Sequence, residues 1–433
     1  MSVYLKNISA NSFLTLSGMS VRFILASLMI RELGPEDYAN WIIWLSITTY
    51  IAMADCGVIS FLQYRLLNAS REKSQRVKLP YWRFWASIFL FVHTLIFFVA
   101  LVFHSFGSAP LFFVILSATA IVQNFARLGQ VFARLMGFYH STVFAQAVAN
   151  IIFLGFCSLF LDQKTTLTQI ASWYCVCFGA VAVWTVLVGR PKTTPDKIFG
   201  VYKGMFFLQP KVRERLGRGR IVFLNSVWFL LNFSIPIFLN SIPIFLLGVY
   251  FDALSLAGFL LTRMLYNLIF MSSNVVFISV IPEGIAAVGK ASASGVKSLI
   301  LKLLTVNILF AATMGSIITY FLEDLFGFWL GAHDRIELEL AFAVFLLSCV
   351  LCSINLCLNI AGAIGYARMI SLVNFGSIFA MVVIGLFVQL MNVGLEIHSY
   401  VLWVVTAPLL IGLLASVALL VTEASPTKVV EKT

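Results

Sequence analysis

Two arginines lie in the middle of apolar segments long enough to cross a membrane: Arg22 in LTLSGMSVRFILASLMI and Arg263 in LAGFLLTRMLYNLIFM. A charge inside a bilayer is costly and normally faces the interior of a helix bundle or a water-filled cavity. A guanidinium can donate two parallel hydrogen bonds to a phosphate or carboxylate group. The two side chains therefore predict a cavity that accepts an anion.

Polar residues recur at helical spacing around these arginines and on two further apolar segments. Side chains three and four residues apart share one face of a helix. Lipid cannot satisfy polar groups, so these stripes should point inward, either lining a cavity or joining helices by hydrogen bonds. Arg127 lies nearer the expected cytoplasmic surface, where snorkelling is a second interpretation. The predicted cavity residues are Arg22, Arg263, Arg127, Asn267, Asn274, Thr15 and Asn355.

Two titratable side chains in the apolar segments are candidates for ion coupling. Asp55 is the one acid predicted to lie within the membrane, and His93 lies in the middle of IFLFVHTLIFF. Asp55 could bind a coupling proton, pair with an arginine or cap a helix at Gly57. His93 could relay protons or form a packed hydrogen bond. Three arginines against one aspartate leave a positive interior, which favours an anionic passenger.

One apolar segment carries two prolines, Pro236 and Pro243. Proline removes a helical hydrogen bond and kinks the axis. This helix is therefore a candidate gate, with a static kink as the alternative interpretation.

These residues must be positioned by membrane-spanning helices. The chain of 433 residues is 61% hydrophobic and 11% charged, whereas soluble domains carry roughly 25% charged residues. A spanning helix needs about 20 mostly apolar residues. The sequence therefore predicts an all-α integral membrane protein with twelve transmembrane helices in two six-helix bundles. The predicted spans are 12–31, 39–62, 83–103, 109–131, 142–161, 167–188, 221–249, 253–280, 299–321, 338–361, 368–391 and 398–421.

The basic residues orient this layout. Of the 29 Lys and Arg, Arg22 and Arg263 lie within spans and three (Arg31, Lys164 and Arg335) lie outside, which leaves 24 on the cytoplasmic side. Positive residues concentrate in cytoplasmic loops, so both termini are predicted to be cytoplasmic. The predicted parts are an N-terminal bundle (1–188), a basic cytoplasmic linker (189–220), a C-terminal bundle (221–421) and a cytoplasmic tail (422–433).

The sequence offers no catalytic arrangement. It contains no H-E-x-x-H, no G-x-S-x-G and no phosphate-binding G-x-x-x-x-G-K-[ST]. Its seven Cys fall within or beside apolar spans without metal-finger spacing. We therefore expect no enzyme activity, no cofactor and no metal site. The net charge of +11 is explained by membrane topology rather than by binding to nucleic acid.

Two stretches resemble a known family. RELGPEDYANWIIWLSITTYIAMADCGVISFLQYRL resembles the opening hairpin of Wzx-type polysaccharide flippases, with their L-G-P-E-x-Y-G-x-W run and intramembrane D-x-G. LLGVYFDALSLAGFLLTRMLYNLIFMSSNVVFISVIPEG resembles the start of that family's second half, including Arg263 and Pro282. Ala39 departs from the pattern, because a Gly is usual there.

This family belongs to the multidrug/oligosaccharidyl-lipid/polysaccharide exporter (MOP) superfamily. The resemblance implies a V-shaped, MATE-like fold in the bacterial cell inner membrane. It implies alternating-access transfer of undecaprenyl-pyrophosphate-linked oligosaccharide units, such as O-antigen for lipopolysaccharide, from the cytoplasmic to the periplasmic leaflet. Expected partners are this glycan, membrane lipids and the polymerase and chain-length proteins of the same pathway. Alternatives are an ion-coupled drug/cation antiporter and a membrane-embedded polysaccharide polymerase or ligase.

Overall fold

Helices form every regular element in the part of the chain that the structure, a computed structural model, describes. That part comprises residues 3–51, 82–107, 109–135, 138–188, 234–289, 293–330, 337–364 and 367–423. The chain divides into two compact units, Met1–Leu33 with Trp44–Phe233, and Gly34–Ile43 with Ser234–Thr433. The predicted linker 189–220 lies outside the described residues.

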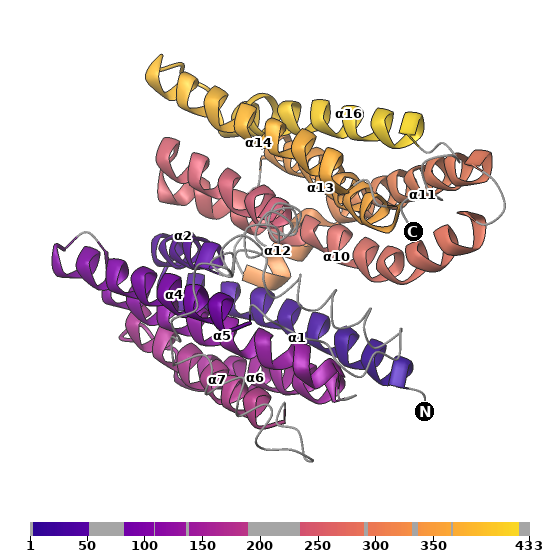
Figure 1. Ribbon diagram of the computed structural model, residues 1–433. Coiled ribbons are helices and arrows are strands. Elements are labelled where there is room, and N and C mark those ends of the chain that lie inside the picture. The colour runs from indigo at the N-terminus through magenta and orange to yellow at the C-terminus, as the bar shows by residue number, and fades with distance from the viewer. Residues whose placement is uncertain are drawn as a thin grey trace. The chain divides into compact units, whose positions relative to one another are not determined.

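The first unit is built from long apolar helices. Within it, α1 packs along α6, and α5 packs along α7 and α4 (Figure 1). Asn150 of α6 donates a hydrogen bond to Ser17 Oγ of α1 (3.1 Å), which is the kind of polar bridge that joins membrane helices. The helices of the first half of the chain are α1 (Val3–Glu32), α2 (Pro35–Ile51), α4 (Trp82–Ser105), α5 (Leu111–Leu135), α6 (Tyr139–Phe160) and α7 (Leu167–Val188).

A glycine sets the turn between α1 and α2. Gly34 has φ +96°, a conformation that side chains disfavour. The Leu33 N–H bonds to Met29 O at the end of α1, and the Tyr38 N–H bonds to Gly34 O at the start of α2. The chain can therefore reverse within two residues, as the L-G-P-E run requires.

The second unit is organised around α13, which packs against α10, α11, α14 and α16. Figure 1 shows α14 and α16 side by side in this unit. Asp252 caps α10 by accepting the Ser255 N–H (3.1 Å), and its contacts with Ser255 hold the pKa of that carboxyl below its usual range. The helices are Ser234–Tyr250, α10 (Ala253–Gly289), α11 (Ala293–Tyr320), α12 (Leu322–Leu330), α13 (Leu338–Ile364), α14 (Ala367–Leu390), α15 (Ile397–Tyr400) and α16 (Ala407–Glu423).

A π-helical segment, η2 (Val401–Thr406), joins α15 to α16. Pro408 lies two residues beyond its end and cannot donate the bond that an α-helix would require of it. The wider turn lets the Ala407 N–H bond to Leu402 O, five residues back. Thr406 Oγ1 donates to Val401 O (2.8 Å), so a side chain satisfies a carbonyl in the distorted turn.

Each of the twelve predicted spans carries a described helix, so the all-α membrane architecture is confirmed. Eight helices are long and apolar enough to cross a bilayer, and three apolar helices are shorter in their described extent. The predicted ends differ from the observed ones: α1 begins at Val3, and α10 runs to Gly289. Residues 322–330, which the sequence assigned to an outer loop, form the helix α12.

Candidate functional site: polar and cationic groups at membrane depth

Two of the predicted cavity arginines, both in the first unit, act on the same tyrosine. Arg22 of α1 and Arg127 of α5 both act electrostatically on Tyr174 of α7. Gln123, one turn before Arg127 on α5, donates through Nε2 to Tyr174 Oη (3.3 Å). Arg22 is exposed and Arg127 is half-buried. We call Arg22, Gln123, Arg127 and Tyr174 the cationic cluster.

The geometry of the cationic cluster suits an anionic group. Three different helices contribute its side chains, and Arg22 lies within an apolar helix that qualifies as a membrane span, Ser9–Glu32. Guanidinium and phenol groups are hydrogen-bond donors that can bind phosphate oxygens. Tyr174 and Gln123 were not predicted as site residues. The helical spacing of Gln123 and Arg127 could have indicated Gln123. No motif indicated Tyr174.

The other polar groups of α1 serve mainly to hold helices together. Thr15 is half-buried and donates to Asn11 O of its own helix (2.9 Å). Tyr139 Oη donates to Asn11 Oδ1 (3.4 Å). Together with the Ser17–Asn150 bond, these contacts favour the hydrogen-bonding interpretation for the polar stripe, apart from Arg22.

His93 lies in a fully buried hydrogen-bonded group of the first unit. Asn124 Nδ2 of α5 donates to Ile51 O of α2 (2.7 Å) and lies 2.9 Å from His93 Nε2 of α4. His93 is 1% exposed. This is the packed arrangement expected as one of two alternatives for His93. Asp55, the other candidate for ion coupling, lies outside the described residues.

Arg263, on α10 in the second unit, has a different environment from Arg22. It is 5% exposed, and its guanidinium lies 5.7 Å from the ring centre of Phe259. Nη1 donates to Asn240 O (2.9 Å), and Nη2 donates to Leu239 O (3.3 Å) and Asn240 Oδ1 (3.1 Å). In this conformation the predicted cavity residue is buried against the backbone of the Ser234–Tyr250 helix.

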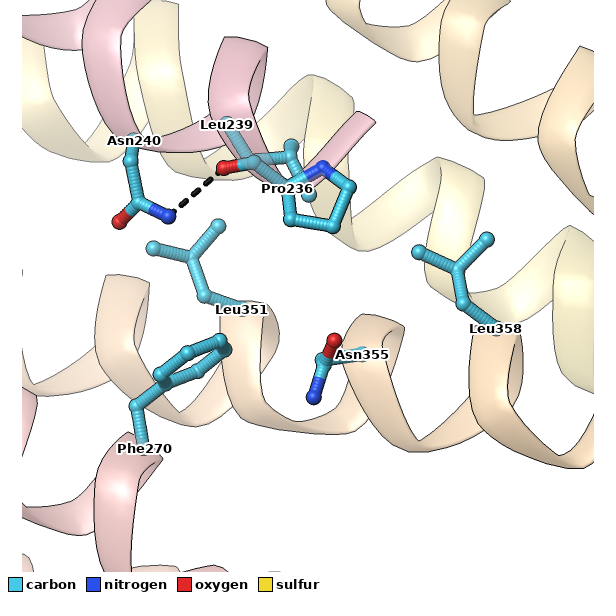
Figure 2. Close-up of a pocket in the computed structure, with 7 residues that line it drawn as sticks. All are labelled: Pro236, Leu239, Asn240, Phe270, Leu351, Asn355 and Leu358. Carbon is cyan, nitrogen blue, oxygen red and sulfur yellow. Dashed lines mark hydrogen bonds between the residues drawn. The ribbon is translucent and has the colours of Figure 1, made fainter. Parts of the chain in front are cut away.

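The candidate gate prolines lie on that same helix, beside a small pocket. Figure 2 shows Pro236, Leu239 and Asn240 across from Asn355 and Leu351 of α13 and Phe270 of α10. The pocket leaves about 10 Å³ for the centre of a water-sized sphere, which is room for roughly one water. Pro243 is buried. Asn355 and Asn267 are half-buried, and Asn274 lies on α10.

A group that could ligate a metal lies at one end of the second unit. Donor atoms of Glu339, Glu396 and His398 lie within 4.8 Å of one another. The imidazole already contacts both carboxylates, with Nε2 3.2 Å from Glu339 and Nδ1 3.5 Å from Glu396. The two Glu side chains are 73% and 81% exposed, so solvent and His398 satisfy them.

Comparison with known proteins shows which solved structures share this fold. The sequence matches no protein-family model and no curated protein. Its fold is similar to that of a MATE-family multidrug resistance transporter of the MOP superfamily in an inward-facing conformation, at TM-score 0.65 and 14% identity over 96% of both chains. It is also similar to the lipid II flippase MurJ in an inward closed conformation, at TM-score 0.63 and 12% identity over 96% of this chain and 89% of MurJ. The Vibrio cholerae MATE transporter VcmN follows at TM-score 0.59 and 12% identity over 98% and 96%.

The chain is therefore a multi-pass membrane protein. It has the fold that a MATE multidrug resistance transporter of the MOP superfamily and the lipid II flippase MurJ share.

Proposed function

We propose that the protein is a flippase for lipid-linked oligosaccharides whose cationic cluster binds the pyrophosphate of the carrier lipid. The observation that carries this proposal is that two arginines of the first unit, Arg22 and Arg127, both act electrostatically on Tyr174, which also accepts a hydrogen bond from Gln123. A drug/cation antiporter needs acidic groups where this unit supplies two guanidinium groups, because a positive site attracts anions. The resemblance to Wzx-type flippases supports an undecaprenyl-pyrophosphate-linked unit of O-antigen type in the bacterial inner membrane.

In this mechanism the pyrophosphate is held by charge and by donated hydrogen bonds. Arg22 and Arg127 supply paired donors, and Tyr174, on which both charges act, supplies a further polar group. The polyprenyl tail stays in lipid, and alternating access carries the head group across. His93 and Asp55 stay the candidates for ion coupling.

The proposal is tested by measuring binding of undecaprenyl pyrophosphate to the purified protein through its tryptophan fluorescence. Undecaprenol, which lacks the charged group, is the matched lipid. We expect Arg22→Ala and Arg127→Ala each to weaken binding of the pyrophosphate about tenfold or more, since a charged hydrogen bond contributes roughly 1.5–3 kcal/mol. Arg22→Lys should retain part of the affinity.

Arg31→Ala is the matched control, because Arg31 is an exposed arginine at the end of the same helix. It should leave binding unchanged. Equal affinity for undecaprenol and its pyrophosphate would contradict the proposal. Tight binding of a lipophilic cation that Arg22→Ala does not weaken would favour the antiporter instead.

A further inference from the structure

Arg263 donates hydrogen bonds to the helix Ser234–Tyr250 beside Pro243, a residue that has no backbone N–H to donate. In an α-helix each carbonyl accepts the N–H four residues later. Pro243 has no N–H, so Leu239 O lacks the donor that an α-helix would normally give it. Nη2 of Arg263 donates to that carbonyl at 3.3 Å, and Nη1 donates to the next one, Asn240 O, at 2.9 Å.

The contact extends one turn further through a side-chain amide. Arg263 Nη2 donates to Asn240 Oδ1 (3.1 Å), and this fixes the amide so that its Nδ2 points away from the guanidinium. Asn240 Nδ2 in turn donates to Pro236 O (2.7 Å), the bond drawn in Figure 2. One guanidinium therefore organises the backbone from Pro236 to Asn240.

We infer that Arg263 is a positioning residue: it supplies the donors that Pro243 lacks and so fixes the shape of the candidate gate helix. The described acceptors of its guanidinium are carbonyl and amide oxygens of that helix, and its flat face lies over Phe259. Charge makes the bonds to these carbonyls stronger than neutral ones would be.

A positioning role for Arg263 and a substrate-binding role predict different effects of a second substitution at position 243. If the guanidinium acts on the backbone, a residue that restores the missing N–H at position 243 should make it dispensable. If it binds an anionic passenger, a change at position 243 cannot compensate for its loss.

The test is a double-mutant cycle on the purified full-length protein without substrate, read out as the midpoint of thermal unfolding in detergent. Arg263→Met keeps the length of the side chain and removes the donors. We expect it to lower the midpoint by on the order of 5 °C, because buried carbonyls lose charged partners. Pro243→Ala restores a backbone donor for Leu239 O, so the double variant should recover at least half of that loss.

Pro236→Ala is the matched control, because an N–H at position 236 lies before Leu239 in the helix and cannot serve Leu239 O. It should give no recovery in the Arg263→Met background. Arg263→Lys, which can reach one carbonyl at a time, should lie between the wild type and Arg263→Met. Additive effects of Arg263→Met and Pro243→Ala, or equal recovery by Pro236→Ala, would overturn the inference.

The result does not depend on the proposed function. The cycle uses no lipid-linked substrate, so it stands if the protein proves to carry something else. In the binding assay for undecaprenyl pyrophosphate, the Arg263→Met/Pro243→Ala double variant should bind as the wild type does. A binding defect that persists in the double variant would return Arg263 to the ligand set and contradict the inference.

Discussion

The hydrogen bonds of Asn124 determine the protonation of His93. Ile51 O can only accept, so the atom of Asn124 facing it is the amide nitrogen. The same NH₂ group faces His93 Nε2 at 2.9 Å. Nε2 must therefore accept, and the imidazole is neutral with its proton on Nδ1. Protonation of Nε2 would place two donors against each other, which links any charging of His93 to a rearrangement of α2, α4 and α5.

Asn124→Leu should therefore destabilise the first unit. The substitution keeps the volume and leaves both Ile51 O and His93 Nε2 without this donor, at a cost of roughly 1–3 kcal/mol for buried polar groups. Thermal unfolding in detergent measures the effect. Asn11→Leu is the control, because Asn11 is exposed and its bond from Tyr139 is long at 3.4 Å. Equal losses from the two variants would contradict a buried, satisfied role for Asn124.

The contact between Arg263 and Asn240 could have been predicted from the sequence. Arg263 and the two prolines were noted separately, as a cavity residue and a gate. The helices Ser234–Tyr250 and α10 are joined by the short turn Phe251–Asp252. Helices joined by a short turn run antiparallel, so residues equally far from the turn face each other. Asn240 lies eleven residues before Phe251, and Arg263 lies eleven after Asp252.

At the scale of helices, α14 and α16 approach closely because of a glycine. A Cβ added at Gly412 of α16 would lie 2.8 Å from the Ser377 Cβ of α14, closer than real contacts allow. Asn374, one turn before Ser377, donates to Ser416 Oγ of α16 (3.0 Å) and holds the same pair together. Small residues let membrane helices approach in this way.

Gly412→Ala should destabilise the second unit by about 1–3 kcal/mol, because overpacking forces the two helices apart. Ser377→Gly should restore most of the loss in the double variant. The measurement is the unfolding midpoint of the detergent-solubilised protein. Gly376→Ala is the control on α14, since nothing lies within 4 Å of a Cβ added there. A loss from Gly376→Ala as large as that from Gly412→Ala would argue against the contact.

Which helices form was predictable, and where they end was not. Apolar runs predict the part of a helix that lies in lipid, so every predicted span carries a helix. Helices continue past the hydrocarbon region with polar residues, which is why α1 begins at Val3 rather than at residue 12. In the candidate site, Arg22 and Arg127 were predicted from the cost of buried charge. Tyr174 was not, because an aromatic residue in an apolar span carries no distinguishing signal.

At the scale of the whole molecule, the orientation in the membrane rests on the distribution of basic residues. That distribution puts the turn between α6 and α7 outside and the start of α14 inside. Lys164 and Arg368 are both exposed and mark these two ends. A cysteine at position 164 should react with a membrane-impermeant maleimide added to spheroplasts, whereas one at position 368 should react only after permeabilisation.

The unsubstituted protein is the baseline for this labelling, because its described free cysteines are buried or half-buried. The reverse pattern would invert the orientation and place Arg127 nearer the outer face.

The contact between the helix Ser234–Tyr250 and α10 depends on the number of residues between Asp252 and Arg263 more than on their types. Each added residue turns an α-helix by about 100°. One residue inserted between Asp252 and Arg263 would swing the guanidinium away from Leu239 O, although every side chain of the helix would still be present. Substitutions at Leu254, a 67% exposed position in the same interval, leave that alignment intact. Among homologous chains, exposed positions of this stretch such as Leu254 should vary in residue type, whereas the number of residues should stay the same.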